Sequence, residues 1–155
     1  MATKHRVDSI KALRNNNLTP QQAKLKENSE TCRRIIETGY KSDVKGDGLQ
    51  PYRMNDDDQI NLSGLQGLII LGLLQDPSGA LLPSFSWQNA NQIKCVDDWH
   101  FSQILGLVKG FGEWKTLVLK RQDEIKEKIL AANTESKLAK VKIEYDDLLV
   151  FGGGA

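Results

Sequence analysis

The sequence predicts a mainly α-helical fold: a small helical domain with a short β-hairpin, preceded by an N-terminal helical arm. Two patterns predict it. Apolar residues recur at helical spacing over two long stretches, and one short stretch, residues 84–96, alternates apolar and polar residues as a hairpin does. The length of 155 residues suits a single core. We divide the chain into an arm at residues 1–30, a helical domain at 31–145 and a flexible tail at 146–155.

The arm begins with a short amphipathic stretch that is marginal as an isolated helix. A second helix is expected to follow it, because Thr19 can act as the N-cap, Pro20 suits the first helical position and Gln22 completes a capping box. We expect Gly39 to end this helix in the left-handed conformation. The first half of the helix carries few apolar residues, so we expect that half to pack on copies of itself or on a partner.

A helix that is apolar on most of its sides is predicted directly after Asn55. Its apolar residues are Ile60, Leu62, Leu65, Leu68, Ile69 and Leu73. A helix that is apolar all round is normally buried, so we interpret this one as the core helix of the domain. The connector before it, residues 40–55, contains glycines and a proline that break any regular period.

The C-terminal third is predicted to hold one long helix, from about Asp97 to Ala132, because apolar residues form a stripe at helical spacing. The stripe consists of Phe101, Ile104, Leu105, Val108, Phe111, Val118, Ile125 and Ile129. Thr134 is placed to cap one last short helix. The tail ends in glycines and is expected to be mobile. Its apolar run at residues 148–151 is expected to add a strand to the sheet edge of a partner.

Charge and composition exclude several classes of protein. The net charge is +1, distributed as +4 over residues 1–48, −3 over residues 49–97 and 0 over residues 98–155. A dedicated nucleic-acid binder needs a basic face, so we expect no nucleic-acid partner. No apolar run is long enough for a membrane span or a signal peptide, so we expect no membrane association and synthesis in a cytoplasm. Cys32 and Cys95 are expected to be buried free thiols.

Three successive aspartates, Asp56, Asp57 and Asp58, are the first candidates for chemistry. A calcium loop needs oxygen ligands at alternate positions and a closing glutamate, which are absent here. A magnesium–phosphate site needs a glycine-rich loop or a basic cluster nearby, and the sequence has neither. Acidic residues at a helix start cap free N–H groups and favour the positive end of the helix dipole, so we interpret the aspartates as a helix start.

His100 is the second candidate, because histidine is the usual acid–base residue near neutral pH. Asp97 and Asp98 precede it, and this cluster is the only hint of an enzyme such as a cell-wall hydrolase. No serine elbow accompanies the histidine, so a hydrogen-bonded histidine at a helix start is the favoured interpretation. We predict no enzyme, no catalytic residue, no metal site and no cofactor.

Read together, residues 30–143 resemble a domain family of uncharacterised biochemistry that occurs in tailed-bacteriophage tail and tail-fibre-associated proteins. The resemblance is carried by Cys32, Ile35, Ile36, Gly39, Tyr40, Ser42, Gly46, Tyr52, Asp58, Gln59, Asn61, Leu62, Trp87, His100, Gln103, Ile104 and the stretch at residues 129–132. The chain departs from the family pattern in the glycines at positions 106, 110 and 112 and in the plain hairpin loop "QNANQ".

The resemblance implies a hypothesis about the polar residues. Because the family pattern places these residues at two helix starts, we expect a structural polar network that joins the starts. Its members are Asp58, Gln59, Asn61, His100 and Gln103, with the last two as partners of the first two. A satisfied buried network of this kind fixes one packing arrangement.

The resemblance also implies a role. We expect a structural component of a phage tail, at the baseplate or the tail-fibre attachment, located in the virion and partnered by other tail or fibre proteins. Because phage fibres are commonly trimeric, we expect a homo-oligomer, with a trimer held by helices at residues 3–17 and 20–38 as the first guess. The alternative is a tail-fibre assembly chaperone that leaves before the virion is complete.

Overall fold

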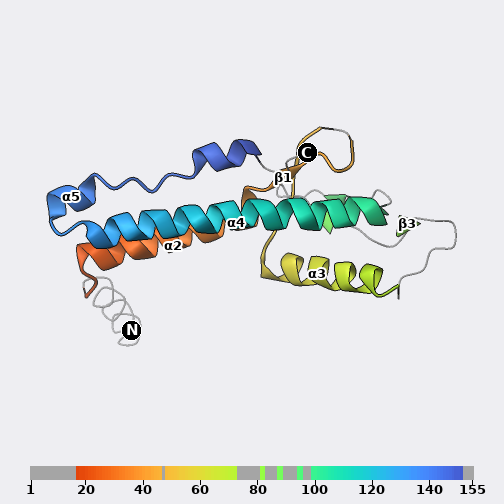
Figure 1. Cartoon of the computed structure of the whole chain (residues 1–155), viewed down its shortest axis with the longest axis horizontal. Helices are drawn as coiled ribbons and strands as arrows, with labels where there is room; N and C mark the ends of the chain where they lie inside the picture. The colour runs from red at the N-terminus through yellow and green to blue at the C-terminus, as the bar shows by residue number, and fades with distance from the viewer. Residues whose placement is uncertain are drawn as a thin grey trace, which may run out of the picture. The chain divides into compact units, whose positions relative to one another are not determined.

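The computed structural model describes residues 17–46, 48–72, 81–82, 87–88, 94–95 and 99–151, and its helices dominate (Figure 1). The helices are α2 Pro20–Thr38, α3 Asp56–Ile70, α4 Phe101–Ala131, α5 Glu135–Ala139 and the 3-10 helix η1 Asp146–Phe151. Three short antiparallel pairs accompany them: β1 Lys41–Ser42 with β2 Gln50–Pro51, β3 Leu81–Leu82 with β6 Trp99–His100, and β4 Trp87–Gln88 with β5 Lys94–Cys95. The mainly α-helical class and the β4–β5 hairpin are confirmed.

The chain divides into two compact units. One joins Met1–Thr31 to Gln122–Ile143, and the other joins Cys32–Arg121 to Glu144–Ala155. The division predicted from the sequence, with an arm, one domain over residues 31–145 and a tail, stays a prediction. The start of α2 shares its unit with the last turns of α4 and the segment after them, so this part of the expected arm has a partner within the chain. Residues 3–16, expected to form the first arm helix, lie outside the described residues.

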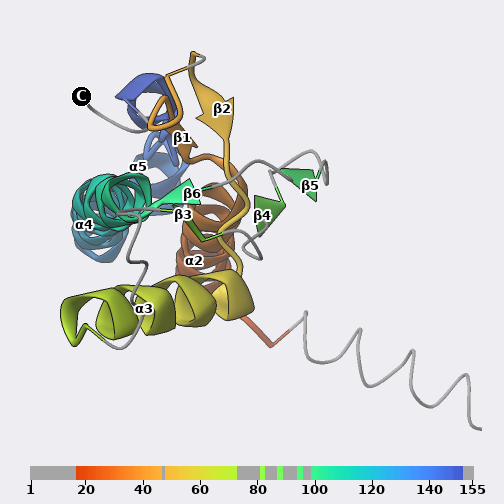
Figure 2. The ribbon, with the colours of Figure 1, turned by 90° about the vertical axis from the view of Figure 1, so that its right-hand side faces the viewer.

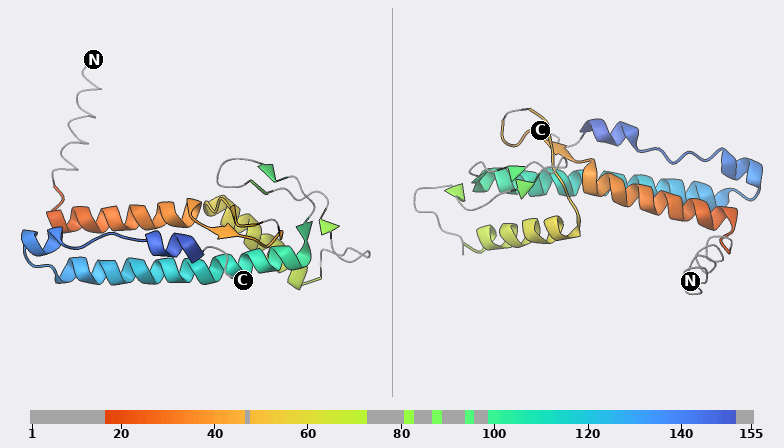
Figure 3. Two further views of the ribbon diagram at one scale, coloured as in Figure 1. Left: turned by 90° about the horizontal axis from the view of Figure 1, so that it is seen from above. Right: turned by 180° about the vertical axis from the view of Figure 1, so that it is seen from behind.

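In the first unit, the start of α2 runs beside the end of α4 (Figure 1, Figure 3). Polar side chains of α2 bind carbonyl groups of α4 and α5. Gln21 Nε2 donates to Ile129 O at 3.0 Å, Lys24 Nζ to Leu138 O at 2.7 Å, and the buried Asn28 donates Nδ2 to Gln122 O at 3.1 Å. This half of α2 thus packs within its own chain through hydrogen bonds, which explains how a helix with so few apolar residues is held. A trimer through α2 stays a prediction.

The N-terminal cap of α2 is as predicted. Gln22 N donates to Thr19 Oγ1 at 3.1 Å, and Thr19 N donates to Gln22 Oε1 at 3.0 Å. These reciprocal bonds form a capping box, which satisfies two N–H groups that the first turn would otherwise leave free. The predicted cap of the last short helix is also confirmed, because Thr134 Oγ1 accepts from Lys137 N at 3.1 Å at the start of α5.

Gly39 follows α2 but does not adopt the expected left-handed conformation. Among the described residues, the glycines with positive φ angles are Gly46, Gly48 and Gly72. Close packing explains the glycine instead. A Cβ at position 39 would lie 2.7 Å from Ile35 O and 2.7 Å from a methyl carbon of Leu149. The prediction of a left-handed stop is therefore wrong, and glycine is required here because backbone and side chains approach it too closely for any larger residue.

The core of the second unit lies along α4. Buried α4 side chains recur every three or four residues at Ile104, Leu107, Phe111, Trp114 and Val118, and Tyr40, Tyr52 and Met54 are buried in the same unit. Of the stripe predicted from the sequence, the members at positions 104, 111, 118, 125 and 129 are buried and those at 105 and 108 are half-buried. The prediction missed Leu107 and Trp114. The core helix is therefore α4 rather than α3, which contributes only Asp58 and Leu62 to the buried set.

Two elements flank α4 within this unit (Figure 2). Looking along α4, α3 lies on one side of the helix and the dark blue η1 lies on the other. The segment expected to be irregular, residues 40–55, contains the β1–β2 pair, and Gly46 and Gly48 take positive φ angles of 79° and 95° in its turn. Glycine adopts such angles without strain, which is why the turn can close.

Candidate interaction surface

The aspartates at positions 56–58 begin helix α3, as the sequence predicted. Asn55 is the N-cap: its side chain accepts from Asp58 N at 2.9 Å, and the Asp58 carboxylate accepts from Asn55 N at 3.2 Å. All three aspartates lie in the first turn, where their charge favours the positive end of the helix dipole. The described residues contain no group of three or more His, Cys, Asp or Glu side chains placed to hold a metal ion.

Asp58 is also fixed from outside the helix. Arg53 Nε donates to Asp58 Oδ2 at 2.6 Å and Arg53 Nη2 to Asp58 Oδ1 at 2.8 Å, a bidentate pair in which the aspartate is buried. The hydrogen bond to this carboxylate raises the pKa of Arg53. Next to it, Gln59 Nε2 donates to Met54 O at 2.8 Å and Gln59 Oε1 accepts from Lys115 Nζ of α4 at 2.7 Å.

The predicted polar network does not form. Among the described residues, His100 and Gln103 make no hydrogen bond to Asp58 or Gln59, because Gln103 Oε1 accepts from His100 N at 2.9 Å and from Lys45 Nζ at 3.4 Å instead. The His100 side chain and Asn61 are exposed. The hypothesis of a single network is wrong: each helix start has its own cap. Asp97 and Asp98, proposed as neighbours of His100, lie outside the described residues.

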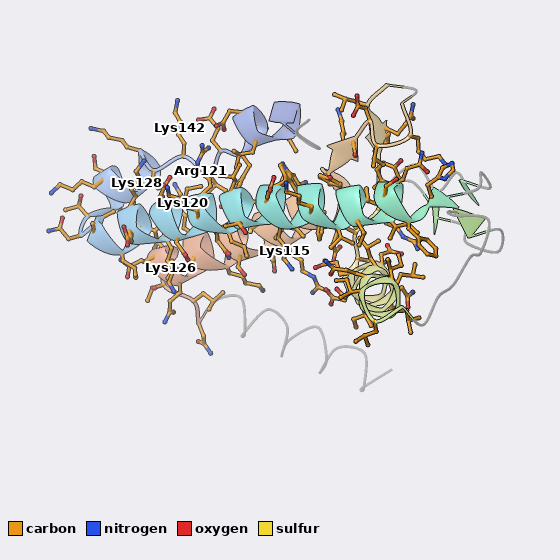
Figure 4. All side chains as sticks on the ribbon, turned by 45° about the vertical axis from the view of Figure 1, so that its right-hand side comes forward. Lys115, Lys120, Arg121, Lys126, Lys128 and Lys142 are labelled. Carbon is orange, nitrogen blue, oxygen red and sulfur yellow. The ribbon has the colours of Figure 1, made fainter. Side chains whose placement is uncertain are left out.

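The last described turn of the chain is docked on α4, which differs from the expected flexible tail. Trp114 Nε1 donates to Leu148 O at 2.8 Å, and the side chain of Leu148 is buried. Arg121, labelled in Figure 4, binds both carboxylate oxygens of Asp147 at 2.7 Å, and this hydrogen-bonded pair lowers the pKa of Asp147. The apolar run near position 148 thus packs within its own chain, and the proposed strand addition would require it to leave this position.

Tyr40 sits in an aromatic cluster with Phe111 and Trp114, at ring-centroid distances of 5.3 and 5.5 Å. Its side chain is fully buried, and its hydroxyl has no hydrogen-bond partner among the described residues. Burial raises the pKa of Tyr40 to about 12. The nearby Ser42 side chain partly offsets this rise of the pKa, although it makes no hydrogen bond to the Tyr40 hydroxyl. The cluster is a packing core with one unsatisfied group, which is a stability feature rather than a binding site.

Helix α3 has two apolar faces, and the described residues bury only one of them. At 100° per residue, Asp58, Leu62, Leu65 and Ile69 fall on one side of the helix, where they are buried or half-buried. The opposite side carries Ile60, Gly64, Gly67 and Leu71, with Leu68 at its edge. We call these five residues the α3 outer face.

The outer face is open and uncharged. Ile60 is 68% exposed, Leu68 40% and Leu71 71%. A Cβ built at Gly64 or Gly67 would meet no atom within 4 Å, so the surface is also free above both glycines. Residues 59–72 contain no charged side chain. Clustered apolar groups on a helix surface are typical of a protein–protein contact, and single exposed leucines are not.

The sequence contained the signal for this face, although it was interpreted differently. Apolar residues on most sides of α3 predicted a core helix, but the structure buries one side and exposes the other. A helix that is apolar all round needs cover all round. The sequence therefore indicated how much of α3 should be buried, but not that the described part of the chain covers only half of it.

Comparisons with protein-family models, curated proteins and solved structures found no match to this chain. Among the described residues, no helix combines the length and the apolar character that a membrane span requires.

Proposed function

We propose that this chain acts by protein–protein interaction as a structural component of a bacteriophage tail, at the baseplate or the tail-fibre attachment. The observation that supports an interaction role is the α3 outer face, because an exposed and uncharged apolar surface on a folded helix is costly in water unless a partner covers it. The assignment to a phage tail is supported by the sequence resemblance over residues 30–143. The same resemblance supports the proposal that its partners are other tail or fibre proteins.

A second candidate is a tail-fibre assembly chaperone, which would use the same face transiently. The two roles differ in where the protein ends up. A structural component remains in the finished virion in a fixed copy number, whereas a chaperone is abundant in infected cells and absent from particles. An apolar face of modest area suits either role, so the structural role is preferred for its agreement with the resemblance.

Quantitative mass spectrometry of purified infectious particles tests the proposal. We expect the chain at a fixed ratio to the major tail protein. Absence from particles, with the protein present in lysates, would overturn the structural role and favour the chaperone.

A pair of variants tests the surface itself. Leu68→Lys places a charge on the outer face, and Leu117→Lys makes the same change at a 49% exposed position on α4, away from that face. We expect Leu68→Lys to reduce incorporation into particles and Leu117→Lys to leave it unchanged. Equal incorporation of both variants would show that the outer face is not the attachment surface.

A further inference from the structure

We infer that the occupant of the α3 outer face is the same face of a second copy of this chain, in an antiparallel helix pair. This inference rests on the proposed interaction role of the face, and it names the partner. Three features of the face support it: its lack of charge, the position of the charges at its ends, and the order of large and small residues along it.

The first feature is the absence of charge. A basic or acidic partner surface would find nothing to pair with between residues 59 and 72, and its own charges would lose water without compensation. A second α3 brings an equally uncharged surface. Burying apolar groups on both sides removes both from water, so self-association satisfies the two faces at once.

The second feature selects the orientation. The exposed charges of α3 are Asp56 and Asp57, both in its first turn. A parallel pair would place the acidic turns of the two copies side by side. In an antiparallel pair centred between positions 65 and 66 they lie at opposite ends, about 27 Å apart along the helix axis at a rise of about 1.5 Å per residue. The two helix dipoles then also oppose each other, which is the favourable arrangement.

The third feature is a match between large and small residues. In an antiparallel pair centred between positions 65 and 66, Ile60 of one copy faces Leu71 of the other, and Gly64 faces Gly67. The space above both glycines is free, whereas Ile60 and Leu71 are large and exposed, so the order large, small, small, large is the same read from either end. The small residues at the centre of such a pair allow the two helices to approach closely. The two-fold axis makes each contact occur twice.

The size of the contact sets its expected strength. One helix face is small beside the roughly 1,600 Å² that standard interfaces bury, so we expect a weak dimer with a dissociation constant on the order of micromolar. The oligomeric state of the full chain should therefore be measured by sedimentation equilibrium over a concentration range that spans about 1–200 µM.

We expect the wild-type chain to shift from monomer to dimer over this range. Leu68→Lys should weaken the dimer at least about tenfold, and the control Leu117→Lys should dimerise as the wild type does. Circular dichroism of each variant checks the fold, which should be unchanged because the replaced side chains are exposed. A monomeric wild type at the highest concentration would overturn the inference. So would a Leu68→Lys variant that unfolds more readily, because the face would then be covered within its own chain.

Cysteine cross-linking tests the orientation. The double variant Ile60→Cys and Leu71→Cys should form covalent dimers under mild oxidation, because the two positions face each other across the antiparallel pair. The single variant Ile60→Cys should form no more than the wild type, because its two copies lie about 17 Å apart in that arrangement. Cross-linking of the single variant would show a parallel pair and reject the model.

Failure of the pairing and failure of the proposed function give different results. A chain that remains monomeric in solution but occurs in virions at fixed copy number keeps the tail role and rejects the second copy as occupant. A chain that dimerises through α3 but is absent from virions keeps the pairing and rejects the structural tail role.

Discussion

The guanidinium group of Arg53 binds both carboxylate oxygens of Asp58, at 2.6 and 2.8 Å, while the same carboxylate accepts from the backbone N–H of Asn55. The buried side chain of Asp58 therefore links the first turn of α3 to the residues just before it, Arg53 and Asn55. The Asp58 carboxylate accepts from three donors and is therefore expensive to replace, because a neutral group in its place leaves the half-buried Arg53 without its counter-charge.

Replacing Asp58 tests this role. We expect Asp58→Asn to lower the free energy of unfolding by about 2 kcal/mol, since it weakens charge-assisted hydrogen bonds and half of the capping box. Asp57→Asn is the matched control: Asp57 is exposed in the same turn, and its loss should cost no more than about 0.5 kcal/mol through the helix dipole. Urea denaturation of both variants measures the difference, and equal values would show that the Arg53 pair contributes little.

The close contact at Gly39 predicts a glycine that cannot be replaced. Gly39→Ala would place a Cβ 2.7 Å from Ile35 O, and backbone atoms cannot move away cheaply. We expect a loss of roughly 1–3 kcal/mol in stability. Gly112→Ala, on an open part of α4, should instead gain up to about 1 kcal/mol from helix propensity. Thermal unfolding of the two alanine variants should show shifts of opposite sign.

The pair between Arg121 and Asp147 predicts an acid-sensitive contribution to stability. The hydrogen bond from Arg121 lowers the folded-state pKa of Asp147 below the ordinary value of about 3.9. The contribution of this pair to the free energy of unfolding is therefore fully present above about pH 4. It is lost as the pH falls through the lowered pKa. The stability difference between wild type and Asp147→Asn, measured in urea, should therefore be present at neutral pH and disappear in acid. Asp146→Asn serves as the control, and a difference for Asp147→Asn that persists in strong acid would contradict the prediction.

The unsatisfied hydroxyl of Tyr40 predicts that this hydroxyl can be removed without loss of stability. Tyr40→Phe keeps the aromatic packing and removes a buried group without a partner, so we expect unchanged or higher stability at neutral pH. Because burial raises the pKa of Tyr40 to about 12, the wild type should lose stability as the pH rises from about 10 towards 12. The phenylalanine variant should lose less over that interval, as measured by denaturation at each pH. A large loss at neutral pH would indicate a partner for the hydroxyl.

The separate caps of α3 and α4 predict different contributions to stability from His100 and Gln103. His100→Ala should change the free energy of unfolding by less than about 0.5 kcal/mol, because the side chain is exposed. Gln103→Ala removes the acceptor of the His100 N–H and should cost about 1 kcal/mol. The reverse order, in chemical denaturation of the two variants, would revive a structural role for the histidine ring.

How far the sequence predicts this molecule depends on the range of the interaction. Caps act over three residues, so Thr19 with Gln22 and Thr134 with Lys137 could be identified from local pattern. The Gly39 contact with Leu149 joins residues far apart in sequence, and local pattern assigned the glycine to a left-handed helix end instead. The expected partners of Asp58 and Gln59 were His100 and Gln103, but local pattern shows neither the Arg53 pair of Asp58 nor the Lys115 contact of Gln59.

Docking of η1 has a consequence for the order in which the second unit can fold. Gly39 and Leu149, which touch, are separated by more than a hundred residues. Synthesis at about 5–20 residues per second places roughly 5–20 s between their appearance. Until then Trp114, a member of the aromatic cluster with Tyr40, lacks its carbonyl acceptor. Folding of this unit is therefore expected to finish only when η1 has been made, and truncation before position 146 should give a chain that begins to fold but does not complete its core.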